Sequence, residues 1–183
     1  MRAMLLLLVL LPALPAAAEG VRVTYLANEG VRIEGGTCDV LIDALFRDSL
    51  GDYPRHDPAV QKNLEAAQVP FDKVGLALAT HFHLDHWDAG AIAQFLKSSP
   101  SAVFASPPAA GAMMPSGLKP RVRALWPDGG RASVRLVENG AVVDAIPLDH
   151  GRPVENLGYR LECGGRTRST WAIRRCRRRT SRR

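Results

Sequence analysis

The chain has 183 residues, a length that allows one compact domain and leaves little room for two. Apolar residues make up 46% of it, a globular composition that excludes a disordered or fibrous protein. The net charge of +6 is distributed unevenly along the chain. Residues 166 to 183 hold nine of the 24 lysines and arginines and no acidic residue, whereas the preceding chain carries 15 basic and 18 acidic residues. The body of the protein is therefore mildly acidic.

Residues 1 to 18 have the layout of a secretory signal peptide. Arg2 precedes an unbroken apolar run from residue 3 to 11, and three alanines end at residue 18. The run is far shorter than the roughly 20 residues that span a bilayer. Pro12 and Pro15 would interrupt a buried helix, which is the alternative interpretation. We expect cleavage after residue 18, a periplasmic or secreted mature chain and no transmembrane segment in it.

The mature chain begins with three predicted strands and a βα unit. The strands cover residues 21–26, 31–34 and 40–42 and are joined by glycine-containing turns. Asp57 and Pro58 indicate the start of a helix that ends before Pro70. An apolar strand over 74–80 and a helix over 88–97 follow.

The rest of the body continues the same mixture of elements. A strand over 101–105 precedes a helical segment rich in proline and alanine that runs through Met114. Strands 134–137 and 141–146 flank a hairpin turn at Asn139 and Gly140, and a last strand covers 156–163. Mixed strands and helices predict an α/β layered domain over residues 19–165.

Export makes disulfides chemically accessible, but three cysteines cannot all pair within one chain. Cys38 and Cys163 lie in predicted strands, whereas Cys176 lies among arginines. A Cys38–Cys163 pair is one option that the sequence leaves open.

Three of the five histidines fall within six positions, together with one aspartate: His81, His83, Asp85 and His86. In an extended segment, residues 81, 83 and 85 would point to the same side. Imidazole and carboxylate are ligands that divalent zinc prefers, and the absence of cysteine favours an open, catalytic site over a closed structural one. The alternative is a solvated polar loop, which does not account for the clustering.

The segment from Thr80 to His86 resembles the His-x-His-x-Asp-His signature of the metallo-β-lactamase superfamily. Leu41-Ile42-Asp43 upstream and Leu148-Asp149-His150-Gly151 after the hairpin add to the resemblance, which covers residues 21 to 167. It implies an αβ/βα sandwich with a metal site at the edge of two sheets.

The resemblance also implies ligands and a reaction. His81, His83 and His150 would bind a first zinc ion, and Asp85 and His86 would begin a second site, so that one or two Zn²⁺ are expected. In that family the metals lower the pKa of a water, and the resulting hydroxide attacks an ester, lactone, amide or phosphodiester bond of a small-molecule substrate. Asp85 would orient that water or take up its proton.

The sequence departs from the family pattern after Gly165. A metal-bridging aspartate is expected within about ten residues, the length of one strand with its loop, but residues 166 to 175 contain no carboxylate, and a final histidine ligand is missing. We expect the second half of the sandwich to be incomplete and residues 166–183 to be the product of a reading-frame shift. A genuine polybasic tail is the alternative, and export argues against nucleic acid as its partner.

Three functions remain open at this stage: a metallo-hydrolase, a metal-binding protein without turnover, and a binder of anionic surfaces through the tail. Among other residues, Trp87 and Phe82 are expected to pack into the core rather than line the pocket. His56 is expected to lie in a solvated surface loop.

Overall fold

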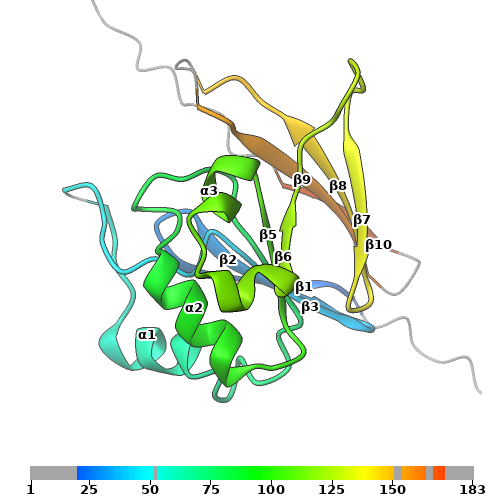
Figure 1. The fold of residues 1–183 in the computed structure, drawn as a ribbon. Helices are drawn as coiled ribbons and strands as arrows, with labels where there is room; N and C mark the ends of the chain where they lie inside the picture. Colours follow the sequence, from blue (N-terminus) through cyan, green and yellow to red (C-terminus); the bar gives the residue numbers. More distant parts are fainter. Residues whose placement is uncertain (1–19, 52, 151–153, 164–166, 172–183) are drawn as a thin grey trace, which may run out of the picture.

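The computed structural model describes residues 20–51, 53–150, 154–163 and 167–171, and for the last of these ranges the backbone alone. Two sheets lie face to face, and three helices cover the outer face of the first sheet (Figure 1). The proposed signal peptide, the turn at Gly164 and Gly165, and Cys176 lie outside the described residues.

The first sheet has six strands in the order β1-β2-β3-β4-β5-β6. Its strands are β1 (Arg22–Ala27), β2 (Gly30–Gly35), β3 (Cys38–Ile42), β4 (Leu76–Leu78), β5 (Val103–Ser106) and β6 (Val122–Ala124). The first three pair antiparallel through short turns, and β3 to β6 pair parallel. Parallel strands need long connections, and the helices provide them.

The two longer helices each begin after an aspartate N-cap, which the sequence analysis identified for the first of them. Helix α1 (Pro58–Glu65) has Asp57 as its N-cap, and α2 (Ala89–Ser98) has Asp88, whose carboxylate accepts a hydrogen bond from Ala91 N at 2.7 Å. Helix α3 (Pro108–Ala112) and the 3₁₀ helix η1 (Ser116–Arg121) connect β5 to β6. The capping aspartate of α2 therefore fixes where the loop after β4 ends.

The second sheet is antiparallel, with the order β10-β9-β8-β7. Strands β7 (Val134–Glu138) and β8 (Ala141–Pro147) form the predicted hairpin, and β9 (Leu157–Cys163) pairs with β8 along its whole length. Strand β10 (Thr167–Trp171) pairs with β9 at the edge.

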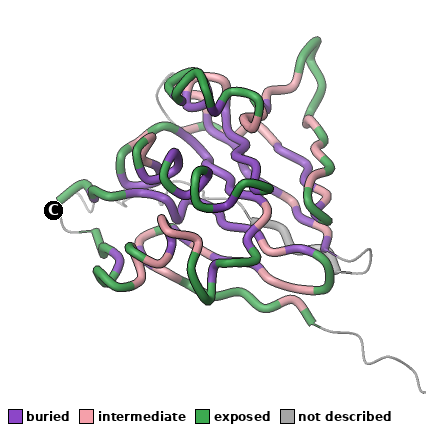
Figure 2. The backbone as a smooth tube through the Cα atoms, turned by 60° about the horizontal axis from the view of Figure 1, so that its bottom comes forward, coloured by how far each residue is buried: buried purple, intermediate pink, exposed green. Residues whose placement is uncertain are grey.

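Two hydrophobic cores lie on the two faces of the first sheet. Val40 and Ile42 of β3 face the second sheet, whereas Leu41 between them faces the helices. The helix side contains Phe95 of α2, which is fully buried and contributes about 1.5–3 kcal/mol by its transfer from water. In Figure 2 the buried segments run through the middle of the molecule, as expected for parallel strands covered on both faces.

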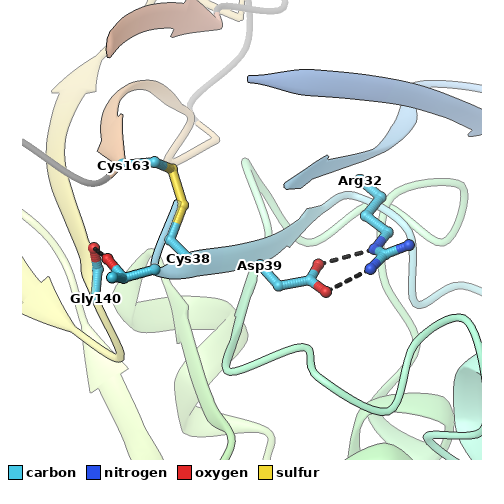
Figure 3. The surroundings of a disulfide bond; sticks show 6 residues. Arg32, Cys38, Asp39, Gly140 and Cys163 are labelled. Atoms are coloured by element: carbon cyan, nitrogen blue, oxygen red, sulfur yellow. Dashed lines mark hydrogen bonds and ion pairs between the residues drawn. A yellow bond between two sulfur atoms is a disulfide. The ribbon is translucent and has the colours of Figure 1, made fainter. Parts of the chain in front are cut away.

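The two sheets are joined covalently at one end. A disulfide connects Cys38 at the start of β3 to Cys163 at the end of β9, with Cα atoms 5.4 Å apart (Figure 3). The pairing that the sequence left open is thus present. Close by, Arg32 of β2 forms a two-point ion pair with Asp39 of β3.

The structure contains elements that the sequence analysis did not predict. Strand β6 is only three residues long and follows the proline-containing η1, so it lacks a periodic signal. Strand β10 lies in the segment that we expected to fall outside the domain. Among the described residues, no helix has the length and apolar character required to cross a membrane.

Candidate metal centre

The candidate site lies where parallel strands of the first sheet end. Strand β3 ends at Ile42 and is followed by Asp43, and β4 ends at Leu78 two residues before Thr80. Because the carboxyl ends of parallel strands meet at one edge of a sheet, these two chain segments emerge side by side. The backbone N–H of Asp43 donates to Leu78 O at 2.9 Å, which locks them together.

The loop from Thr80 to Trp87 is a tight turn rather than an extended segment. The backbone N–H groups of His86 and Trp87 both donate to His83 O, at 3.0 and 3.2 Å. The segment from His81 to Asp85 is therefore not extended as predicted, and His81 and His83 gather with His150 rather than with Asp85 in the three-ligand group of the described residues. Asp85 Oδ2 instead lies 3.7 Å from His86 Nε2.

Three histidines converge on one point. Ring nitrogens of His81, His83 and His150 all lie within 4.8 Å of one another, and this is the one group of three potential metal ligands in the described part of the chain. His81 Nε2 lies 3.0 Å from His83 Nδ1, and the His81 and His150 ring centroids are 4.5 Å apart. The cluster joins the two sheets, because His150 follows β8 whereas His81 follows β4.

A buried hydrogen-bond chain orients His81. The Asp43 carboxylate is fully buried and accepts from Thr80 N and from Thr80 Oγ1, each at 2.7 Å. Thr80 Oγ1 is also 2.9 Å from His81 Nδ1. Because the Thr80 hydroxyl donates its proton to Asp43, it accepts a hydrogen bond from His81 Nδ1. His81 therefore carries its proton on Nδ1, and the lone pair of Nε2 faces the cluster.

His81 is kept neutral by its surroundings. Burial, followed by the nearby His86, His150 and His83, lowers the pKa of His81 to about 2. A neutral imidazole is the form that binds a metal ion, so the pocket favours ligation over protonation.

His86 has the opposite electrostatic character. Burial acts against its charge, but the hydrogen bond from Nδ1 to Asp43 Oδ2 at 3.0 Å, with the charges of Asp43, Asp85 and Glu29, raises the pKa of His86. Its Nε2 faces Asp85, whose buried Oδ1 has no hydrogen-bond partner. Asp85 and His86 thus form a second pair of donor atoms beside the three-histidine cluster.

Strand β9 of the second sheet is hydrogen-bonded to the chain segment that leads from β4 into this loop. Leu157 N donates to Thr80 O at 2.9 Å, and the hydroxyl of Tyr159 donates to Ala79 O at 2.6 Å. Burial and the charge of Asp43 raise the pKa of Tyr159 well above its ordinary value, so its hydroxyl keeps the proton. Both contacts fix β9 relative to β4.

The β1–β2 hairpin braces the site from the first sheet, which the sequence analysis missed. Asn28 Nδ2 donates to Asp85 O at 2.9 Å. A side chain at Gly30 would meet the carbonyl oxygen of Asp43 at 2.9 Å, so only glycine allows this close approach. The glycine-containing turn was visible in the sequence, but its contact partners were not.

Three weaker sequence expectations have mixed outcomes. Trp87 is buried in the helix-side core, as predicted. Phe82 is 37% exposed, with its ring centroid 5.6 Å from that of His83, so the expectation of core packing was wrong. His56 is buried and its Nε2 lies 2.9 Å from Ala44 O, because the polar loop folds back over Phe46 rather than extending into solvent.

Comparisons with known proteins agree with this architecture. No protein-family model matches the sequence, and no curated protein matches it either. Among solved structures, the metallo-β-lactamase fold protein YhfI from Bacillus subtilis aligns with a TM-score of 0.51 and 19% identity, over 85% of this chain and 55% of that one. This chain has the metallo-β-lactamase fold.

Two further structures with this similarity differ in their chemistry. A possible metal-dependent hydrolase from Veillonella parvula aligns with a TM-score of 0.55 and 19% identity, over 85% of this chain and 61% of that one. CmlA, a diiron β-hydroxylase from Streptomyces venezuelae, aligns with a TM-score of 0.53 and 18% identity, over 86% and 30%. The chain therefore spans at most about three fifths of the length of these three structures.

Proposed function

We propose that this protein is a metal-dependent hydrolase whose ion is held by His81, His83 and His150. The observation that carries the proposal is the convergence of their ring nitrogens within 4.8 Å from two different sheets. The donor set fits a catalytic zinc ion, since three imidazoles leave a coordination position open for water or substrate. A divalent metal bound there lowers the pKa of a water molecule and polarises the bond to be cleaved.

The residues around the cluster have separate roles in this proposal. Asp43, through Thr80, holds His81 in the tautomer that can ligate. Asp85 orients the attacking water and accepts its proton on a carboxylate oxygen, and its unpartnered buried Oδ1 supports this assignment. Asp85 and His86 together begin a second metal position, which is also the assignment that the sequence resemblance implies.

We assign the ion as zinc and the substrate as a small molecule with an ester, lactone, amide or phosphodiester bond. Imidazole ligands suit zinc, although CmlA is a diiron protein with the same fold, so metal analysis must compare zinc with iron. Phe82 and Leu84, which is 53% exposed, flank His83 in the loop and provide apolar contact surface for a substrate.

We also propose that the mature protein acts in the periplasm or outside the cell after cleavage at residue 18. The Cys38–Cys163 disulfide supports an oxidising compartment. Mass spectrometry of the exported protein tests this directly: an N-terminus at Glu19 is expected, and retention of Met1 would contradict it.

Metal content and activity test the catalytic proposal together. We expect about one zinc per chain after dialysis, its loss in His83→Ala, and hydrolysis of at least one member of a panel of esters, lactones, amides and phosphodiesters. His56→Gln is the matched control, because His56 is also buried but contacts Ala44 and Phe46 rather than the cluster. Equal zinc content in wild type and His83→Ala would rule out the ligand assignment.

A second candidate is a protein that retains metal without turnover. It is favoured by the single three-ligand group in the described part of the chain. Stoichiometric zinc without hydrolysis of any panel substrate distinguishes it from the enzyme.

A further inference from the structure

Besides Asp85 Oδ1 and Trp87 Nε1 of the histidine loop, two buried polar atoms near the cluster have no hydrogen-bond partner among the described residues and do not bond to each other. They are His150 Nδ1 and Asn156 Oδ1. A ring nitrogen can carry a proton and donate it, whereas an amide oxygen only accepts. The two unpaired atoms are therefore chemically complementary.

The backbone brings these residues into one short loop. Leu148 N donates to Asn156 O at 2.9 Å, and Asn156 Nδ2 lies 3.5 Å from Leu148 O, which closes the base of the loop. His150 lies two residues beyond this closure. The next residue after Asn156 is Leu157, whose N–H donates to Thr80 O beside His81.

Asn156 is poorly explained by packing alone. Its side chain is 2% exposed, and leaving its oxygen unpaired there costs free energy that an apolar residue of the same size would avoid. His81 and His86 already have partners for Nδ1 in Thr80 and Asp43. A metal-ligating histidine usually donates its second ring N–H to such an acceptor, and His150 Nδ1 has no partner among the described residues.

We infer that Asn156 is the positioning residue of His150. If the other ring nitrogen of His150 held a divalent ion, Nδ1 would carry the proton and could donate it to Asn156 Oδ1, an acceptor that would fix the ring orientation and the ligating tautomer. This inference rests on the proposed metal site. It adds a residue outside the histidine signature and gives the buried amide oxygen a role.

The test compares acceptor-free and acceptor-retaining variants. Asn156→Leu is expected to weaken zinc affinity 10- to 100-fold in competition with a chromogenic chelator. Asn156→Asp keeps an oxygen acceptor and is expected to bind zinc within about threefold of wild type. With Co²⁺ as a spectroscopic probe, the visible absorption of Asn156→Leu should differ from that of wild type, and the spectrum of Asn156→Asp should resemble it. If Asn156→Leu does not fold, Asn156→Ala replaces it.

Asn139→Asp is the matched control. Asn139 Nδ2 also joins the second sheet to the first, by donating to Gly75 O at 2.6 Å and Ser101 O at 3.1 Å, but it does so away from the cluster. Loss of the Nδ2 donor in Asn139→Asp is expected to lower the urea midpoint of unfolding and to leave the zinc affinity unchanged.

The outcomes separate this inference from the proposed function. A wild-type protein that binds no zinc overturns both. Wild-type binding that Asn156→Leu leaves unchanged overturns the inference alone, as does equal weakening by Asn156→Leu and Asn156→Asp. A change in KM with unaltered zinc affinity would instead place Asn156 against the substrate and would also overturn it.

Discussion

The Asp43 carboxylate accepts two hydrogen bonds from Thr80, one from the backbone N–H and one from the hydroxyl, each at 2.7 Å. Asp43 has a φ of 48°, a left-handed conformation that a short polar side chain tolerates better than most. It also accepts from His86 Nδ1. One fully buried carboxylate thus connects a ligand of the three-histidine cluster to the adjacent pair of donors.

Replacing this carboxylate should impair folding and metal binding together. Asp43→Ala leaves three buried donors without an acceptor and should lower the free energy of unfolding by about 3–5 kcal/mol. Asp43→Asn keeps the shape and should weaken zinc binding 10- to 100-fold. Urea unfolding and chelator competition measure the two effects.

Asp39→Asn is the control for that experiment. Asp39 is a partly buried carboxylate on β3 that pairs with Arg32 away from the cluster. Its variant should lose stability but bind zinc as wild type does. Equal zinc affinities for Asp43→Asn and wild type would contradict the role of Asp43.

Much of the fold and part of the site could be predicted from local sequence. Capping residues such as Asp57 and Asp88 and the Asn139-Gly140 turn act within a few positions, so their elements began and ended near the expected residues. The histidine signature placed the site at the end of a buried strand for the same reason.

What the sequence could not predict depends on contacts between distant segments. The partners of Asp43 lie 37 and 43 positions away, and those of Asn28 and Tyr159 lie 57 and 80 positions away. The expected extended conformation of residues 81 to 85 was wrong for another reason: two backbone hydrogen bonds to His83 O close a turn that the alternation rule for extended chains does not describe.

Zinc should stabilise the folded protein in a way that depends on His150. A ligand that binds only the native state at 100 times its dissociation constant adds about 2.7 kcal/mol. Thermal unfolding with zinc and with EDTA should therefore give separated midpoints for wild type, and coincident midpoints for His150→Ala. A zinc-induced rise that persists in His150→Ala would show that the ion binds elsewhere.

The metal-free protein should lose stability as the pH falls below about 6.5. The pKa of His81 is lowered in the folded state, to about 2, and burial lowers that of His56 as well, so the unfolded chain binds protons there that the folded chain does not. Each such group lowers the free energy of unfolding by up to about 1.4 kcal/mol for every unit that the pH falls between the unfolded and folded pKa values of that group. His86 opposes this, because its raised pKa contributes stability at low pH that is lost as the pH rises through its folded value.

Urea unfolding at pH 7.5 and 5.0 with EDTA present measures this balance. Because folding lowers the pKa of two histidines, His81 and His56, and raises that of one, His86, we expect the wild type to be less stable at pH 5.0. His81→Gln should show a smaller difference between the two pH values. A difference as large as that of wild type would mean that His81 does not cause it.

Reduction of the Cys38–Cys163 disulfide should destabilise the protein strongly. The bond closes a loop between residues 125 positions apart, and the loop-entropy account assigns about 4–5 kcal/mol to such a closure. Urea unfolding with and without reductant should show this shift, and Cys38→Ser should abolish the dependence on reductant. Cys176→Ser is the control, in which the shift should persist.

The second metal position should be weak in this chain. Asp85 and His86 supply two donors, and the described residues bring no third ligand to them. We propose that a reading-frame shift after Gly165 has removed the bridging carboxylate, although the backbone of residues 167–171 still pairs with β9. The gene, translated in the other two frames beyond that codon, should encode an apolar strand ending in Gly-Asp.

Restoring that frame tests the proposal by metal stoichiometry. The 183-residue chain should retain about one zinc after dialysis and hydrolyse its substrate slowly, because the second ion lacks both a ligand and the negative charge that offsets two dications. The restored chain should retain two ions and turn over faster. If neither frame encodes such a strand and the 183-residue chain already binds two ions with full turnover, the arginine-rich segment belongs to the working enzyme.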